Sequence, residues 1–300
     1  MPGWRSIVIG TGARLSVRHA QLHVVTDAGE TSVPLEDLDS VMLESYRITA
    51  SCAVLAEMAQ RGIAVFVCDR KHMPCGVLLS FNRHHRSAEI VQAQFSTTLP
   101  FRKRCWQAIV RQKIRNQAAC LDILGRDGGE NLRHIASSVV SGDSTGREAY
   151  AARCYFAAID PAFRRHSDRP LSSALDYGYA VVRALLARYL AVQGLVLSEG
   201  VGHANRLNRF NLADDFLEPF RPMVDTVVFS EPPGDELTPT YRARLAGVVH
   251  HECEMDDGTY TLSTAAEAVA ESYARACQHR DYRLLRLPIL SAQTTLRMYE

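Results

Sequence analysis

The first eighty residues alternate between short apolar runs and polar turns. The apolar runs are rich in β-branched residues, are separated by clusters of Gly, Asp and Glu, and lie at residues 6–10, 15–17, 22–25 and 40–43. This pattern is typical of short strands. Residues 50–62 follow the spacing of an amphipathic helix that ends at a glycine. Two further runs, at residues 63–68 and 76–81, predict additional strands, so this part of the chain is expected to be rich in β-structure.

After Asn82 the apolar residues change to helical spacing. Three of the stretches that show it are residues 106–121, 185–190 and 264–276. The change of period predicts an α+β protein with a small N-terminal β-rich domain, residues 1–85, followed by a larger all-α C-terminal domain, residues 86–300. No internal repeat interrupts this division.

Composition indicates a soluble globular protein. The chain has 300 residues, of which 47% are hydrophobic and 22% charged, with a formal net charge of +1. Its eight cysteines include no C-x-x-C pair, which favours reduced thiols over a disulfide framework. The most apolar stretch, residues 181–197, contains Arg183 and Arg188, so it is expected to be a buried core helix and not a membrane span. We therefore expect a cytoplasmic protein with no membrane association.

Basic residues gather just after the predicted domain boundary. Between Phe81 and Cys120 the only acid is Glu89, and the basic residues are Arg83, Arg86, Arg102, Lys103, Arg104, Arg111, Lys113 and Arg115. Such a stretch can be an ordinary solvated helix face or a surface that follows DNA phosphates. The charge pattern alone leaves both interpretations open.

Three segments contain residues capable of chemistry, whereas phosphate-loop, nucleophile-elbow and H-E-x-x-H patterns are absent. Thr145 and Glu148 have the spacing of a helix-capping box, an interpretation that competes with a catalytic role for Glu148. His203, Asp215 and Glu218 form a second group, in which the two carboxylates face the same way if residues 215–218 are helical. They need water, cations or a metal ion beside an apolar run. The third segment, residues 250–253 (HHEC), is interpreted as lacking a site, because adjacent residues of an extended chain point to opposite faces.

These segments together resemble a known family. Residues 142–156 (GDSTGREAYAARCYF) are similar to the glutamate-bearing helix of the CRISPR-associated Cas-one family, and residues 174–179 (ALDYGY) resemble its N-x-L-N-Y-G-Y signature. Residues 202–222 resemble its histidine segment followed by D-x-x-E-x-F-R-P. Asp176 departs from the usual Asn. Pro219 replaces a second Glu and predicts that the helix ends or kinks there, as in the branch associated with type II CRISPR systems.

The resemblance implies a site and a reaction. It makes Glu148, His203 and Glu218 ligands of Mg²⁺ or Mn²⁺, with Asp215 as a further catalytic acid. The implied activity is that of a DNA endonuclease and integrase, which inserts short DNA fragments as new spacers into a CRISPR repeat array by 3′-hydroxyl transesterification. A stand-alone metal-dependent nuclease acting on branched DNA, or a non-catalytic DNA-binding scaffold, remains an alternative.

The resemblance also implies partners. Family members form homodimers through the N-terminal domain, and two dimers flank a dimer of the Cas-two protein in a heterohexameric integration complex. Double-stranded DNA is the expected nucleic acid. The candidate phosphate contacts are Arg83, Arg86, Arg102, Lys103, Arg104 and Arg147.

Overall fold

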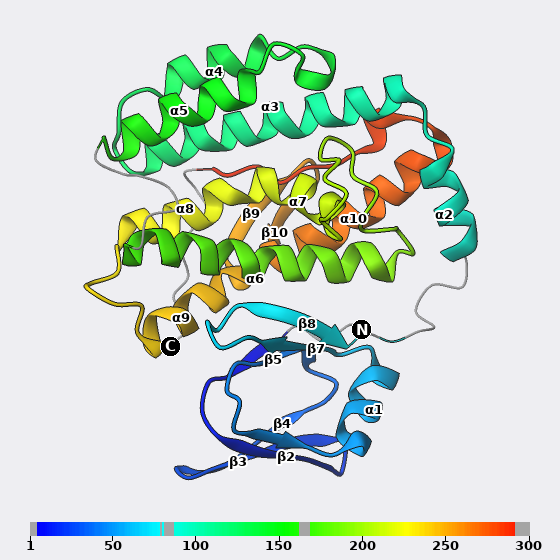
Figure 1. Cartoon of the computed structure of the whole chain (residues 1–300), viewed down its shortest axis with the longest axis vertical. Coiled ribbons are helices and arrows are strands. Elements are labelled where there is room, and N and C mark those ends of the chain that lie inside the picture. Colours follow the sequence, from blue (N-terminus) through cyan, green and yellow to red (C-terminus); the bar gives the residue numbers. More distant parts are fainter. Residues whose placement is uncertain (1–4, 79, 81–86, 162–168, 292–300) are drawn as a thin grey trace.

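The computed structural model describes residues 5–78, 80, 87–161 and 169–291. It places a β-rich N-terminal region below a layered bundle of helices (Figure 1). The change from strands to helices falls between Leu78, the last residue of the final N-terminal strand, and Ser87, where the next helix begins. The predicted boundary at residue 85 lies outside the described residues and stays a prediction.

Two four-stranded sheets make up the N-terminal region. The first has the order β1-β5-β7-β8, with β1, β5 and β7 parallel and β8 antiparallel at one edge. The second has the order β4-β3-β2-β6. The strands are β1 (Arg5–Ile9), β2 (Ala13–Arg18), β3 (Gln21–Thr26), β4 (Gly29–Pro34), β5 (Leu38–Leu43), β6 (Ile48–Ala50), β7 (Ala64–Cys68) and β8 (Pro74–Leu78).

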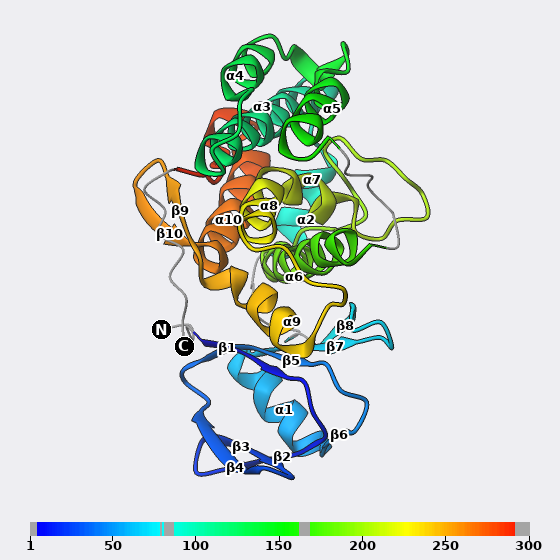
Figure 2. The same ribbon diagram turned by 90° about the vertical axis from the view of Figure 1, so that its left-hand side faces the viewer.

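Helix α1 (Cys52–Arg61) packs against both sheets (Figure 2). Ser51 caps its first turn, since the Ser51 side chain accepts a hydrogen bond from the backbone of Val54. Gly62 ends it in the left-handed conformation, as the glycine signal in the sequence predicted. The core beneath α1 is a separate apolar cluster that includes Leu22, Met58 and Val65.

The C-terminal region consists mainly of helices, which confirms the predicted fold class. They are α2 (Ser87–Phe95), α3 (Leu99–Ile123), α4 (Gly129–Ser137), α5 (Arg147–Ile159), α6 (Pro170–Val192), α7 (Asn211–Leu217), α8 (Arg221–Ser230), α9 (Pro239–Ala246) and α10 (Leu262–His279). Short 3₁₀ turns are η1 (Ser141–Asp143), η2 (Glu218–Phe220), η3 (Gly247–His250) and η4 (Tyr282–Leu284). A hairpin of β9 (Glu252–Met255) and β10 (Gly258–Thr261) adds a feature that an all-α domain does not include.

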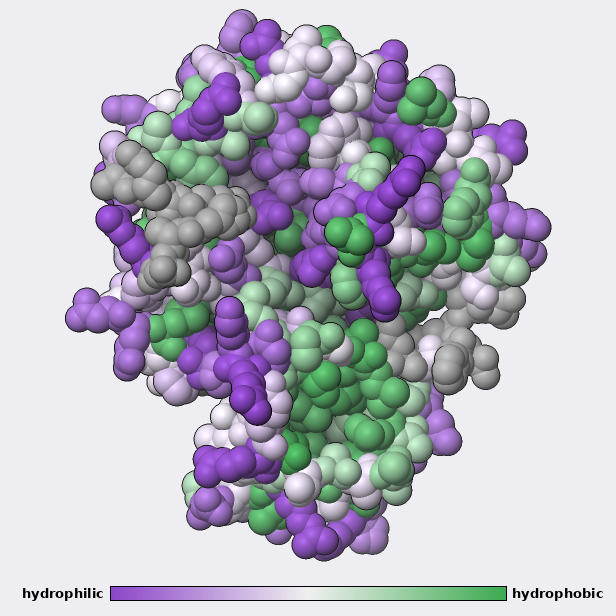
Figure 3. All heavy atoms as spheres, in the orientation of Figure 1, coloured by the Kyte–Doolittle hydropathy of each residue, from purple (hydrophilic) through white to green (hydrophobic). Residues whose placement is uncertain are grey.

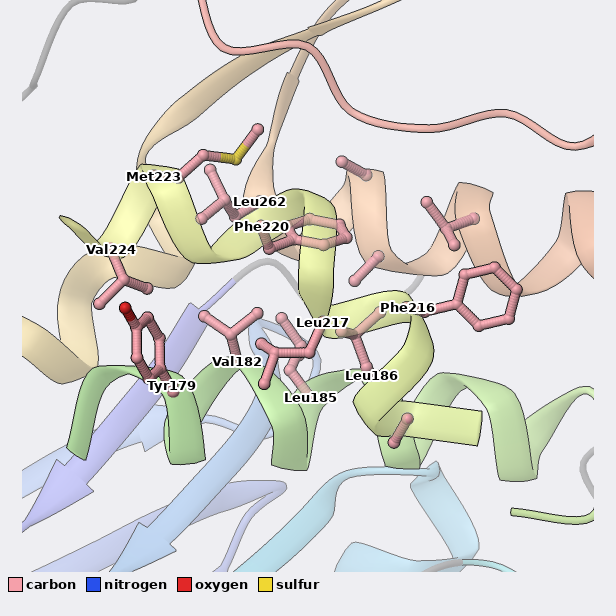
Figure 4. Close-up of a cluster of buried hydrophobic side chains, with 14 of the residues drawn as sticks. Tyr179, Val182, Leu185, Leu186, Phe216, Leu217, Phe220, Met223, Val224 and Leu262 are labelled. Atoms are coloured by element: carbon pink, nitrogen blue, oxygen red, sulfur yellow. The ribbon is translucent and has the colours of Figure 1, made fainter. Parts of the chain in front are cut away.

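The segment from α7 to α8 lies in the middle of the helical layers. Phe216, Leu217 and Phe220 pack between α6 and α10 in a dry cluster (Figure 4). Gly178 lets α6 approach α8 closely, because a Cβ there would meet Val224 Cγ1 at 2.5 Å. This burial fixes the segment that carries Asp215 and Glu218.

Helix α6 also joins the two regions. Its Arg188 is 1% exposed and donates to Asp39 Oδ1 of β5 at 2.8 Å, while a second guanidinium nitrogen contacts Asp39 Oδ2. The prediction that residues 181–197 form a core helix is confirmed up to Val192, where α6 ends. Arg188 is tolerated there because its charge is paired.

The face shown in Figure 3 carries an apolar area where the two regions meet. Phe66, Val77, Ala180 and Ala184 line a hollow of about 260 Å³ at this place. Among the described residues, no helix has the length and apolar character needed to span a bilayer.

Candidate active site

Glu148 stands in the first turn of α5. The backbone N–H groups of Arg147 and Glu148 donate to the carboxylate of Asp143, at 2.8 and 3.0 Å. The capping-box interpretation of Thr145 is therefore wrong: Gly146 occupies the N-cap position without a side-chain hydrogen bond, and Asp143 supplies the acceptors. Glu148 is left free of capping, with its side chain 26% exposed.

Asp215 on α7 is fully buried and holds the loop that carries His203. Its carboxylate accepts hydrogen bonds from the backbone N–H groups of Val201, Gly202 and His203. It also lies 2.7 Å from His203 Nδ1. Burial raises the pKa of Asp215, and these hydrogen bonds oppose that rise. Such a convergence of donors suits the ionised carboxylate, so Asp215 orients His203 and does not itself face the open site.

The His203 imidazole has one nitrogen committed to Asp215. This hydrogen bond raises the pKa of His203, burial opposes the rise, and the charges of Glu218 and Glu148 add to it. Because Nδ1 is held by Asp215, Nε2 is the nitrogen left for another partner. The ring also meets the edge of Trp106, with centroids 5.5 Å apart. Gly202 permits this contact, because a Cβ there would lie 2.3 Å from the indole.

Glu218 begins the 3₁₀ turn η2, directly after α7. The predicted break at Pro219 is confirmed as this change of helix type. The Lys113 ammonium of α3 donates to Glu148 Oε1 at 2.7 Å and makes an ion pair with Glu218 Oε2. Arg221 donates from Nε to Glu218 Oε1 at 3.0 Å. Burial acts to raise the pKa of Glu218, yet Lys113 and Arg221 together lower it to about 2.

One cation thus lies between two carboxylates from different helices. Two carboxylates and an imidazole are a donor set that suits Mg²⁺ and especially Mn²⁺. As the described residues stand, no three His, Cys, Asp or Glu side chains converge closely enough to hold a metal ion. The donor types suit a divalent cation, but to hold one, Lys113 must move from between Glu148 and Glu218, and His203, which is 42% exposed, must turn toward them.

The predicted DNA-binding residues are divided among several surroundings. Lys103 and Arg104 are exposed on α3, whereas Arg102 lines a hollow of about 240 Å³ beside Gly200. Arg147 is partly buried at the start of α5. Arg83 and Arg86 lie outside the described residues.

Lys113 and Arg221 are site residues that the sequence did not identify as such. Lys113 was counted in the basic stretch, but it is only 8% exposed. Its position between the apolar residues Val110 and Ile114 on α3 was a signal for a buried lysine. Arg221 follows Glu218 by three residues, a spacing that brings two helical side chains together.

The structure also locates two other sequence features. Asp176 falls within α6, so the segment 174–179 is helical. His250 ends η3, and burial lowers the pKa of both His250 and His251, the latter to about 4.

Comparison with known proteins identifies the family. A sequence profile described as "CRISPR associated protein Cas1" matches residues 7–240. The chain belongs to the Cas1 family. It is 36% identical over 291 residues to a CRISPR-associated endonuclease Cas1 of Neisseria meningitidis serogroup C, covering 95% of this chain and 96% of that relative. A CRISPR-associated endonuclease Cas1 of Pyrobaculum aerophilum is 27% identical over 266 residues, covering 82% and 90% of the two chains.

Solved structures share the Cas1 fold at low sequence identity. A casposase bound to integration product has a TM-score of 0.74 at 18% identity, and the likeness covers 92% of this chain and 91% of that one. A Cas1 protein from Thermotoga maritima has a TM-score of 0.63 at 17% identity, covering 94% and 96%. At these identities the likeness establishes the fold, and the family assignment rests on the sequence matches.

Proposed function

We propose that this Cas1-family protein is a metal-dependent DNA endonuclease and integrase of CRISPR adaptation. Its substrate would be a short DNA duplex, and its product that duplex joined to a CRISPR repeat. The observation that carries the proposal is the convergence of Glu148 and Glu218 on one cation, Lys113, beside a histidine braced by Asp215. Carboxylates next to DNA repel phosphate unless a cation lies between them. The family membership and the endonuclease name of the Neisseria relative support the same function.

Glu148, Glu218 and His203 Nε2 would hold Mg²⁺ or Mn²⁺. Bound there, the ion supplies Lewis-acid stabilisation of charge on the attacked phosphate and on the leaving oxygen. Asp215 fixes the His203 ring and its tautomer, which is a positioning role. Arg221 stays paired with Glu218 and keeps that carboxylate ionised.

The proposed reaction is a transesterification. The 3′-hydroxyl oxygen of the short duplex forms a new bond to phosphorus and gives its proton to solvent. The bond from phosphorus to the leaving 3′-oxygen breaks, and that oxygen takes up a proton from solvent to become a new 3′-hydroxyl. Water in place of the hydroxyl gives strand cleavage by the same site. Arg102, Lys103, Arg104 and Arg147 are the described candidates for phosphate contacts, with Arg83 and Arg86 as further candidates.

We also propose that the protein forms homodimers, two of which flank a Cas2 dimer in a heterohexameric complex. A solved Cas6-RT-Cas1–Cas2 complex contains a chain with the same fold, with a TM-score of 0.70 at 19% identity, covering 98% of this chain and 36% of that one. Assignment to the type II branch, which rests on Pro219, belongs to the same proposal.

A strand-transfer assay tests the activity. The reaction would contain a short duplex with free 3′-hydroxyl ends, a supercoiled plasmid carrying the CRISPR repeat of the same genome, the Cas2 partner, and Mg²⁺ or Mn²⁺. Wild type should join the duplex at the repeat ends, and Glu148→Ala should lose more than about 100-fold, since even outer-shell partners of a metal cost 10- to 100-fold. Glu130→Ala is the matched control, because its side chain is 92% exposed on α4.

Three outcomes separate the alternatives. Joining by wild type and Glu130→Ala, but not by Glu148→Ala, supports the integrase. Metal-dependent cutting without joining, in this reaction or with a branched duplex used in place of the plasmid, indicates a stand-alone nuclease. DNA binding with neither joining nor cutting indicates a scaffold.

A further inference from the structure

A second, buried set of contacts joins the same three chain segments as the proposed metal site. It is formed by Cys120, Tyr155 and Asp225, and is called the lower layer. Cys120 follows Lys113 by seven residues on α3, Tyr155 follows Glu148 by seven on α5, and Asp225 follows Glu218 by seven. Seven residues are about two helical turns, so Lys113 and Cys120 lie on one face of α3, and Glu148 and Tyr155 on one face of α5. Glu218 belongs to the 3₁₀ turn η2 and Asp225 to α8, but the right-handed backbone continues between them, with φ −54° and ψ −45° at Glu218 and φ −86° and ψ −21° at Phe220. The same three segments therefore meet twice.

The lower layer is held by direct contacts between uncharged and charged groups. The Tyr155 hydroxyl donates to Asp225 Oδ2 at 2.8 Å and lies 3.1 Å from Cys120 Sγ. Tyr179 of α6 donates to the other oxygen of Asp225. Thr226 Oγ1 lies 3.2 Å from the same sulfur. Cys120, Tyr155 and Asp225 are each at most 1% exposed, so water does not compete for these contacts.

A carboxylate at position 225 destabilises the folded state by its burial. Burying a carboxylate among apolar side chains costs several kcal/mol, and an apolar residue would fill the space without that penalty. A polar network whose groups are all hydrogen-bonded instead holds the segments that it joins in one fixed geometry. Tyr155 joins α5 to α8, and these are the helix that carries Glu148 and the helix that continues the segment carrying Glu218.

The contacts of the upper layer, formed by Lys113, Glu148 and Glu218, would change, unlike those of the lower layer, if a metal ion bound there. Among the contacts of the described residues, the two carboxylates of the upper layer are joined only through the Lys113 ammonium, which lies where they converge. A divalent cation bound there would displace it, and the contact that Lys113 makes with both Glu148 and Glu218 would then be lost. The lower layer contains no group that the cation displaces.

We propose that the Tyr155–Asp225–Cys120 layer is a positioning device for the metal site. It holds α5 at a fixed separation from the α7–α8 segment, so that Glu148 and Glu218 keep the spacing that one cation requires after Lys113 leaves. Tyr155, Asp225 and Cys120 are positioning residues, because none of them touches substrate or metal. The inference rests on the proposed metal-dependent function and names the residues that support it.

The experiment measures Mn²⁺ binding to the full chain without DNA, from the electron paramagnetic resonance signal of free Mn²⁺. Tyr155→Phe removes the hydroxyl and keeps the ring. Tyr177→Phe is the matched control: it is also a buried tyrosine, 1% exposed on α6, but its hydroxyl lies 4.0 Å from Met42 Sδ and outside the layer. Melting temperatures are recorded for both variants, so that loss of stability is separated from loss of metal affinity.

Tyr155→Phe should weaken Mn²⁺ binding about three- to tenfold, somewhat less than the loss of a direct outer-shell partner. Tyr177→Phe should bind as wild type does, within about twofold. Equal binding by wild type and Tyr155→Phe would overturn the inference. If Tyr155→Phe does not fold, Cys120→Ala, which removes only the sulfur contact, is judged by the same comparison.

Glu148→Ala distinguishes failure of the inference from failure of the proposed function. If wild type binds no more Mn²⁺ than Glu148→Ala does, the proposed metal site is wrong and the inference falls with it. If Glu148→Ala abolishes binding while Tyr155→Phe and Cys120→Ala leave it intact, only the inference is wrong.

Discussion

Two buried ion pairs in this protein have similar chemistry and different surroundings. Arg188 and Asp39 join the helical region to the β-rich region, and both side chains are at most 6% exposed. Lys113 joins Glu148 and Glu218 at the candidate active site, where Glu148 is 26% exposed. The first pair is enclosed, whereas the second is partly exposed to solvent through Glu148. Burial keeps the Arg188–Asp39 pair out of reach of a ligand, whereas a ligand could reach and replace Lys113 between Glu148 and Glu218.

The two sites also differ in the basic residue that they use: the enclosed pair uses arginine, and the partly exposed site uses lysine. Arg188 uses two nitrogens of its planar guanidinium on the two oxygens of Asp39, a geometry that fixes direction. Lys113 offers a compact charge on a flexible stem to two separate carboxylates. A lysine can leave such a place with less reorganisation than a bidentate arginine needs.

The largest expected effect concerns the enclosed pair. Arg188→Met should lower the free energy of unfolding by about 3–5 kcal/mol, because Asp39 is left charged and buried without its partner. Unfolding in urea, followed by circular dichroism, measures this loss. Arg188→Met combined with Asp39→Asn should recover a large part of it. A loss below about 1 kcal/mol would mean that the pair is not the tie between the two regions.

Lowering the pH should reduce the stability contribution of the Lys113–Glu218 ion pair, because Glu218 becomes protonated. The folded-state pKa of this carboxyl is lowered to about 2 from 4.5, so its contribution to stability is fully present above about pH 4.5 and is lost as the pH falls toward 2. The contribution is at most about 3 kcal/mol. Unfolding free energies of wild type and Glu218→Gln, measured between pH 6 and the acid limit, should differ most at pH 6 and converge in acid. Parallel curves would contradict the role of Lys113 and Arg221 in holding the ionised form.

Lys113→Met should separate stability from metal affinity. The metal-free protein should lose about 2 kcal/mol, less than for Arg188→Met, because Arg221 stays with Glu218 and Glu148 reaches solvent. Its Mn²⁺ affinity should rise by about tenfold, since an attraction of roughly 1.4 kcal/mol no longer competes. Both are measured on the same preparation, by urea unfolding and by electron paramagnetic resonance. Weaker Mn²⁺ binding would show that Lys113 supports the cation instead of competing with it.

The smallest expected effect concerns the turn that presents Glu148. Asp143→Ala removes the acceptor for two N–H groups at the start of α5 and should cost about 1 kcal/mol, the usual effect of losing a cap. Thr145→Ala is the matched control, since Thr145 is exposed and does not cap the helix. Urea unfolding of both variants is the measurement. A larger loss for Thr145→Ala would restore the capping-box interpretation.

The change from strands to helices was predictable from the sequence, because it depends on local periods, whereas strands β4 and β6 were not predicted. The strand patterns of the first eighty residues and the helical spacing around Ile109 and Leu185 each describe a single segment. The hairpin β9–β10 was not predicted, because its strands are only four residues long and a pairing partner defines them.

For the candidate site, the sequence proposed four residues but indicated neither the roles of Lys113 and Arg221 nor the geometry. Glu148, His203 and Glu218 were identified through a family pattern, but the sequence did not show that Asp215 faces the 201–203 backbone or that Lys113 lies between the carboxylates. These contacts join residues far apart in the chain, such as Lys113 and Glu218. No local pattern encodes a distance of that kind.

The proposed metal site is tested most directly by diffraction from crystals of the protein soaked in Mn²⁺, with data collected at the manganese absorption edge. One anomalous peak is expected, bounded by Glu148, Glu218 and His203 Nε2, with the Lys113 ammonium displaced from between the two carboxylates. A peak elsewhere, or Lys113 still bridging Glu148 and Glu218 at saturating Mn²⁺, would contradict it.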